Sequence, residues 1–279
     1  MRYEIAYQPS YSLAVVHLER GEEIRCESGA MVSMSSDLVL EAKMNGGSEN
    51  KGLLGSAFGA LKRKVLGGES FFVTTVRADQ APGEVTLAPS TPGDIVAMPL
   101  DGRALLVQAG SYLASAMTVE VDTKIDLGGG IKNLVGGESL FFLKVSGRGP
   151  VFLTSFGAIH EKKLQPGERY TVDSGHLVAY EEGMAMDVGM ASEQGGFLKR
   201  GLNSVTTGEG LVMKFTGPGT VWLQTRNPEA FSNWVYSLLP KPQGAAAAAP
   251  TSPEAAVGGA LLGGAGALLG GMFGGDDEG

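Results

Sequence analysis

Three short sequence signatures recur along this chain in the same order, and internal repetition constrains a fold more strongly than composition does. The most conspicuous signature is found at GGESFFV (67–73), GGESLFFL (136–143) and, in a degraded form, TGEGLVMKF (207–215). Its copies are about 70 residues apart. A glycine turn followed by an aromatic and β-branched run predicts a turn and then a strand.

A second signature places a strand between two glycine turns. LERGEEIRCESGAMV at 18–32 aligns without a gap to LQPGERYTVDSGHLV at 164–178, and LDGRALLVQAGSYL at 100–113 is a weaker copy. We expect the second glycine of each copy to occupy a backbone position with positive φ. These glycines are Gly29, Gly110 and Gly175.

The third signature, G-x-V-x-L, occurs as GEVTL (83–87), GPVFL (149–153) and GTVWL (219–223). Alternate side chains of a strand point to opposite faces, so its Val and Leu should face the core. The residues between them, Thr86, Phe152 and Trp222, should lie on the other face.

The three signatures together predict three structural repeats, about 1–88, 89–158 and 159–240. The 43 glycines among 279 residues favour many tight turns. Because one repeat is too short to bury a core alone, we expect a single all-β domain over 1–240 with pseudo-threefold symmetry.

One short helix should close this domain. Asn227, Pro228 and Glu229 offer a cap, a first-turn proline and an acidic first turn. Apolar residues then recur at helical spacing up to Pro240, which should stop the helix: Phe231, Trp234, Val235 and Leu238.

The C-terminal segment, 241–279, has a different composition. A Pro/Ala linker leads into GGALLGGAGALLGGMFGG, which has no charge over 258–275. Half of this run is glycine, which disfavours a transmembrane helix. Two readings stay open: a disordered tail, or a segment that contacts a membrane or a partner through small-residue spacings.

Composition excludes some functions. The formal net charge of −8 and the single basic run at 62–64 argue against nucleic-acid binding. A single cysteine, Cys26, rules out an intramolecular disulfide, and we expect it to be a small residue in a strand. The first 20 residues contain no uninterrupted apolar stretch, so we expect no signal peptide and a cytoplasmic location.

No catalytic motif is present, and we expect neither enzymatic activity nor a cofactor. His17, His160 and His176 lack metal-binding spacing, and no G-x-S-x-G elbow occurs. Equivalent glutamates follow the GG turns at Glu69, Glu138 and Glu209. They could form a carboxylate triangle that binds a cation, or each could simply accept hydrogen bonds within its own turn.

The segment before the first GGES motif combines an apolar face with a basic edge, as a short interfacial helix does. Equivalent stretches before the other two copies again mix glycine, apolar and basic residues. The candidate membrane or partner residues are Leu53, Leu54, Phe58, Leu61, Lys62, Arg63 and Lys64, then Ile131 and Lys132, then Phe197, Leu198, Lys199 and Arg200. The alternative is that these apolar residues fold back as a lid on the core.

These motifs carry a resemblance. GLLGSAFGALKRKVLGGESFFVTTV at 52–76, the second GGESLFF and the paired Ser-Gly turns resemble the altered inheritance of mitochondria protein 24 family over about residues 1–240. The resemblance implies a fold like that of the trp RNA-binding attenuation protein, with three tandem repeats on a shortened double-stranded β-helix plan. It implies a role in inner-membrane organisation for mitochondrial members, no established activity for bacterial ones, and no catalytic residues.

We therefore expect a non-catalytic scaffold or adaptor that forms a homo-oligomer. Its partner would be another protein or an anionic membrane surface, contacted peripherally through the apolar-basic segments, the glycine-rich tail or both. The alternative is a small-molecule or metal-binding module that uses grooves between the repeats or the three glutamates. The sequence names neither the partner nor the ligand.

Overall fold

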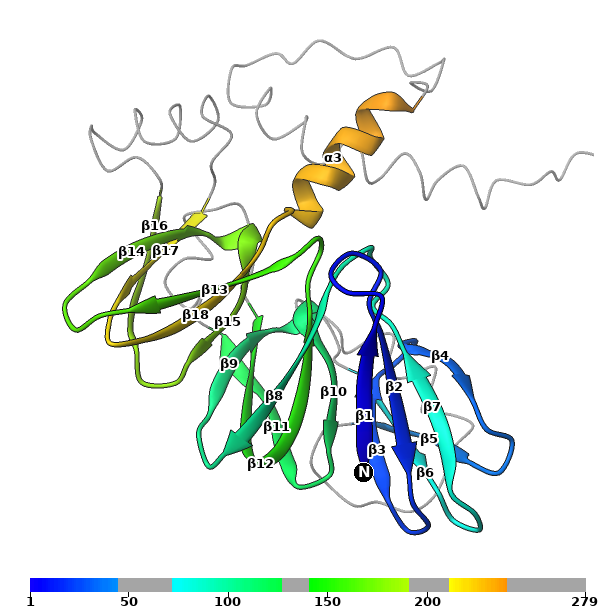
Figure 1. The fold of residues 1–279 in the computed structure, drawn as a ribbon. Coiled ribbons are helices and arrows are strands. Elements are labelled where there is room, and N and C mark those ends of the chain that lie inside the picture. Colours follow the sequence, from blue (N-terminus) through cyan, green and yellow to red (C-terminus); the bar gives the residue numbers. More distant parts are fainter. Residues whose placement is uncertain (45–71, 127–140, 191–210, 240–279) are drawn as a thin grey trace, which may run out of the picture. The chain divides into compact units, whose positions relative to one another are not determined.

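The computed structural model describes four stretches of the chain: residues 1–44, 72–126, 141–190 and 211–239. Their secondary structure is mostly antiparallel β-strand, with one α-helix among them, α3 (Pro228–Leu238) (Figure 1). The chain divides into two compact units, Met1–Asn233 and Trp234–Gly279, and every described strand belongs to the first. The predicted all-β fold with one short C-terminal helix is confirmed.

The strands form three successive groups. The first group follows the N-terminal strand β1 (Arg2–Ala6) and contains β2 (Leu13–Leu18), β3 (Glu23–Glu27), β4 (Met31–Met34), β5 (Val39–Met44), β6 (Phe72–Arg77) and β7 (Gly83–Leu87). The second contains β8 (Ile95–Asp101), β9 (Leu105–Gln108), β10 (Tyr112–Ala116), β11 (Val119–Asp126) and β12 (Phe141–Thr154). The third contains β13 (Ile159–Leu164), β14 (Arg169–Asp173), β15 (Leu177–Glu181), β16 (Ala185–Met190), β17 (Leu211–Thr216) and β18 (Gly219–Gln224).

The same four antiparallel pairings occur in each group. In the first group, β2 and β4 pair with β7, while β3 and β5 pair with β6. In the third group, β13 and β15 pair with β18, while β14 and β16 pair with β17. In the second group, the long strand β12 pairs with β9 and β11 through its first half and with β8 and β10 through its second half.

Two further pairings join the groups to one another. Strand β3 of the first group pairs with β10 of the second, and β9 of the second pairs with β15 of the third. They produce an 11-stranded sheet that runs through all three groups. The described strands also form a four-stranded sheet, β1-β2-β7-β4, and a three-stranded sheet, β14-β17-β16.

The turn glycines only partly follow the prediction. Gly29 has a φ of 90°, as predicted, but the prediction is wrong for Gly110 and Gly175. These two residues lie in single 3-10 turns, η1 (Ala109–Ser111) and η2 (Ser174–His176), and such turns use negative φ angles. Positive φ occurs instead at the first glycine of the signature in every copy, at Gly21 (86°), Gly102 (87°) and Gly167 (77°).

The G-x-V-x-L strands are buried on both faces. Val151 and Leu153 pack in the core of the second group, as their alternation predicts. Phe152 points to the other face of β12, and there it enters the core of the first group. Trp222 of the third group likewise packs in the core of the second. In β12 and β18, the face opposite the Val and Leu residues is therefore a contact between strand groups.

Helix α3 begins as the sequence predicts. The Asn227 side-chain oxygen accepts hydrogen bonds from the backbone N–H groups of Glu229 (2.9 Å) and Ala230 (3.1 Å). This cap satisfies two donors that have no partner inside the helix. Near its start, the Phe231 ring packs edge-on against Phe156, with ring centroids 5.1 Å apart.

Candidate functional site

The predicted membrane or partner residues lie outside the described residues, within 45–71, 127–140 and 191–210. Glu69, Glu138 and Glu209 lie in the same three segments. The described strands do fix where each segment begins and ends.

Each of these segments joins two strands that pair with one another. The register places Met44 opposite Phe72 in β5 and β6, and Asp126 opposite Phe141 in β11 and β12. In the third group it places Met190 opposite Leu211 in β16 and β17. Both ends of every segment are therefore neighbours across a β-ladder, at the same hairpin of each strand group.

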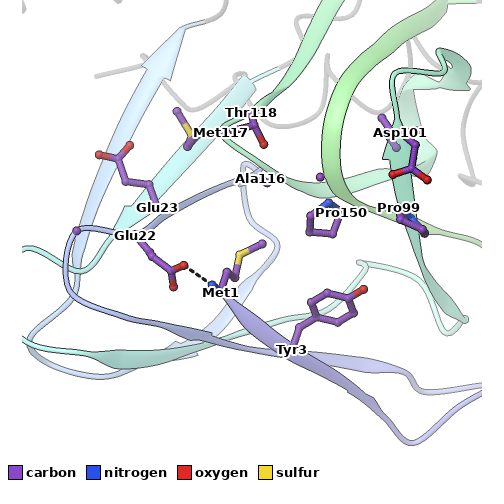
Figure 2. A pocket seen from close by; sticks show the side chains of 13 residues that line it. Met1, Tyr3, Glu22, Glu23, Pro99, Asp101, Ala116, Met117, Thr118 and Pro150 are labelled. Carbon is purple, nitrogen blue, oxygen red and sulfur yellow. Dashed lines mark hydrogen bonds and ion pairs between the residues drawn. The ribbon is translucent and has the colours of Figure 1, made fainter.

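A pocket of about 560 Å³ lies where the first and second strand groups meet (Figure 2). On one side lie Met1, Tyr3 of β1, and the turn between β2 and β3 of the first group. The second group contributes the end of β8, the turn between β10 and β11, and β12 at Gly149 and Pro150. The pocket is thus built from parts of the chain that are distant in sequence.

The pocket lining combines apolar side chains with carboxylates. Its acidic members are Glu22, Glu23 and Asp101, and among the described residues the Met1 amino group is the one basic group that lines it. The amino group of Met1 and the backbone N–H of Glu19 both hydrogen-bond the Glu22 carboxylate, which lowers the pKa of Glu22 (Figure 2). Such a lining suits a ligand with an apolar body and a positively charged or donor group.

The equivalent junction between the second and third groups is bridged by an ion pair and a backbone hydrogen bond. Arg103 Nη1 lies 3.6 Å from Glu181 Oε1, and the Glu182 N–H donates to the Ala104 carbonyl (2.9 Å). Arg103 follows its turn glycine as Glu22 follows Gly21, and Glu181 ends β15 as Ala116 ends β10. With Glu22 and Ala116 at these positions, the first junction cannot form this ion pair.

Sequence reasoning did not identify the pocket residues. The pairing of β3 with β10 helps to bring them together, and no local pattern predicts that pairing. A signal was nevertheless present in the sequence. When the glycine turns of the repeats are aligned, Glu22 and Arg103 occupy the same position, and this change of charge distinguishes the two junctions.

Cys26 is a buried strand residue, as predicted, with 1% of its surface exposed. Its thiol lies 3.5 Å from the Thr74 carbonyl oxygen. Burial raises the pKa of the Cys26 thiol to about 12, so the nucleophilic thiolate is not formed at neutral pH. Burial also raises the pKa of the neighbouring Glu27 carboxyl to about 7.

The three histidines have separate surroundings. His17 Nδ1 lies 3.6 Å from Glu84 Oε2, and His176 Nδ1 lies 2.8 Å from the Gln224 carbonyl oxygen. His160 is an exposed residue of β13. Within the four described stretches, no three His, Cys, Asp or Glu residues are grouped as a metal site requires.

The described helical segment offers no membrane span. Within residues 1–44, 72–126, 141–190 and 211–239, no helix is both long enough and apolar enough to cross a bilayer.

Comparison with known proteins identifies the family. Residues 3–226 match the model of the family described as mitochondrial biogenesis AIM24. An uncharacterised protein of Streptococcus pyogenes serotype M6 is 32% identical over 241 residues, which cover 86% of this chain and 92% of that protein. A crystal structure of a Streptococcus pyogenes protein has 30% identity and a TM-score of 0.67, covering 85% of this chain and 99% of the other. As the resemblance of residues 52–76, the second GGESLFF and the paired Ser-Gly turns indicated, the chain belongs to the mitochondrial biogenesis AIM24 family.

Proposed function

We propose that this protein is a non-catalytic scaffold that binds an anionic membrane surface peripherally, through segments 45–71, 127–140 and 191–210. The observation that carries the proposal is the strand register at the ends of these segments. Each segment leaves and re-enters the same hairpin of its strand group, so the three apolar-basic segments are attached at equivalent positions of the three groups.

The charge distribution supports an anionic partner. The three segments contain seven of the 22 Lys and Arg residues and five of the 30 Asp and Glu residues. They therefore carry a net charge of +2, while the rest of the chain carries −10. Apolar residues beside basic ones add the hydrophobic contact that an acidic protein needs to approach anionic lipid.

Vesicle sedimentation tests the proposal. The full chain should sediment with phosphatidylcholine vesicles that contain phosphatidylserine, and much less with phosphatidylcholine alone. Phe58→Asp combined with Lys62→Glu should reduce this binding. The matched control changes charge equally on the described surface, at exposed positions, with Tyr11→Asp and Arg148→Glu.

Three results would contradict the proposal. In the first, the full chain does not sediment with the anionic vesicles. In the second, the control variant with Tyr11→Asp and Arg148→Glu loses as much binding as the variant with Phe58→Asp and Lys62→Glu. In the third, a chain lacking residues 244–279 loses binding completely, which would assign the contact to the tail.

The pocket between the first two strand groups supports a second candidate function, small-molecule binding. Its acidic and apolar lining favours primary amines with an aromatic or aliphatic body. A thermal-shift series of such amines tests this candidate, because a ligand that binds the folded state raises the melting temperature. The matching carboxylic acids should give no shift.

A further inference from the structure

The contacts between strand groups follow one rule. We call β3, β9 and β14, which occupy the same place in their groups, strands of the β3 type, and we call β4, β10 and β15 strands of the β4 type. A strand of the β3 type in one group pairs with a strand of the β4 type in the next group, as β3 does with β10 and β9 with β15. This rule leaves β14 without a partner from a following group, at one end of the series. At the other end, it leaves β4 without a partner from a preceding group. In the part of the chain that the structure describes, each is the end strand of its sheet, with a neighbour on one edge.

The two pairings have the same register. Ala114 lies opposite Cys26, and Ala179 lies opposite Val107. The β4-type strands share a register shift after their first residue, which places Ser33 of β4 at the position of the two alanines. Counting from the turn glycines places Val172 of β14 at the position of Cys26 and Val107.

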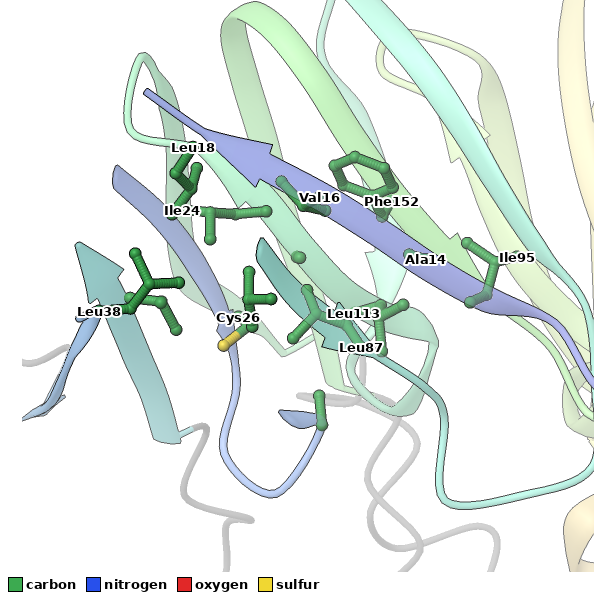
Figure 3. Packing of buried hydrophobic residues seen from close by; sticks show 14 of the residues in the cluster. Ala14, Val16, Leu18, Ile24, Cys26, Leu38, Leu87, Ile95, Leu113 and Phe152 are labelled. Atoms are coloured by element: carbon green, nitrogen blue, oxygen red, sulfur yellow. The ribbon is translucent and has the colours of Figure 1, made fainter. Parts of the chain in front are cut away.

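The β4-type strands also complete the core of the preceding group. Leu113 of β10 belongs to the first core, the same cluster of buried residues that contains Val16 and Ile24 of the first group (Figure 3). Val178 of β15 packs in the second core. Both side chains are 0% exposed, whereas Val32, the equivalent residue of β4, is 59% exposed. Val32 therefore occupies a position that is buried in the other two groups, but it is exposed to solvent in the single chain.

We propose that β4 of one copy of this chain pairs with β14 of a second copy. The register within the chain predicts Ser33 opposite Val172, with Val32 packed against the third core of the other copy, next to Phe215 and Leu164. Pairing of exposed strand edges is a general mode of association, because it satisfies the free backbone groups of both strands. The two edges differ, so the contact is head-to-tail and generates a ring or a filament.

This contact is more polar than those within the chain. The second and third groups offer an alanine and an aromatic residue beside the bulge, Ala114 with Phe152 and Ala179 with Trp222. The first group offers Ser33 and Thr86, whose hydroxyl oxygens are 2.6 Å apart in a hydrogen bond. The association between copies should therefore be reversible and depend on protein concentration.

Disulfide trapping between separate full-length chains tests the proposal. One chain carries Ser33→Cys and the other carries Val172→Cys, and both carry Cys26→Val to remove the native thiol. Directly opposite residues of a strand pair have Cα atoms about 4.5–5.5 Å apart, within the range of a disulfide. The control replaces Val172→Cys with Thr171→Cys, whose side chain points to the opposite face of β14.

The expected result is a disulfide that joins Ser33→Cys to Val172→Cys on different chains, at least several times more abundant than the control product. Thr171 is exposed and Val172 is 4% exposed, so random collision would favour the control. Equal or greater trapping of Thr171→Cys overturns the proposal, as does the absence of any disulfide. A chain with Ser33→Cys and Val172→Cys together should form covalent multimers, and a purely intrachain disulfide would also overturn it.

Discussion

Val32 and Leu113 occupy equivalent positions in β4 and β10, yet Val32 is 59% exposed and Leu113 is completely buried. The difference arises because β10 has a strand of the preceding group beside it and β4, the first strand of its type, has none in the described chain. The same residue position is thus a core position inside the series and a surface position at its end.

The two positions should respond differently to truncation in dilute solution. Leu113→Ala should lower the free energy of unfolding by about 2–5 kcal/mol, because it leaves a cavity in the first core. Val32→Ala should change it by less than about 0.5 kcal/mol. Urea unfolding of both variants measures the difference, and similar losses at the two positions would mean that Val32 is covered within its own chain.

Val32 should matter for association at higher protein concentration. Val32→Lys places a charge against the core of the second copy and should shift sedimentation toward the monomer. Val39→Lys is the matched control, since Val39 of β5 is also an exposed strand valine, 37% exposed. If both variants sediment like the unmodified chain, Val32 takes no part in self-association.

Glu27 should make stability depend on pH between about 4.5 and 7. Burial raises its pKa in the folded state from 4.5 to about 7, so folding favours the protonated carboxyl. Its contribution is fully present below pH 4.5 and is lost as the pH rises through about 7. Glu27→Gln keeps the shape without the charge. The melting temperature of this variant minus that of the unmodified chain should therefore increase from pH 5 to pH 8. A constant difference over that range would contradict the raised pKa.

Ala116→Arg should close the pocket between the first two groups. The new guanidinium would face Glu22, which recreates with reversed polarity the ion pair of Arg103 and Glu181 in the next junction. An exposed pair of this kind adds at most about 1 kcal/mol, so the fold should be preserved. Any amine that stabilises the unmodified chain in thermal-shift measurements should lose its effect. An unchanged shift would place the ligand elsewhere.

Local patterns were sufficient to predict strands at the three repeated signatures and the helix. Turn glycines followed by alternating apolar residues located β7 and β18, and the cap at Asn227 located α3. These elements depend on residues within a few positions of one another, so the sequence signal is strong. The glycines with positive φ were harder to predict. A turn that needs positive φ, such as the one at Gly102, and a 3-10 turn, such as the one at Gly110, both contain glycine and small or polar residues, so composition does not distinguish them.

Contacts between the strand groups could not be predicted in the same way. Alternation assigns Phe152 and Trp222 to the face opposite their own core, and it does not reveal that a second core lies there. Large aromatic residues on that face were the available signal. The pocket was missed because the approach of Glu22 and Ala116 depends on a pairing across about 90 residues of chain.

Membrane partitioning of lysine variants tests the proposed function most directly. Lys62→Gln, Lys132→Gln and Lys199→Gln each remove one positive charge from a different segment, and each should weaken binding to phosphatidylserine vesicles about 5-fold, or about 1 kcal/mol. The triple variant should bind about 100-fold more weakly than the unmodified chain, because separate sites on one surface contribute additively. Equal binding of the triple variant and the unmodified chain would contradict the proposal.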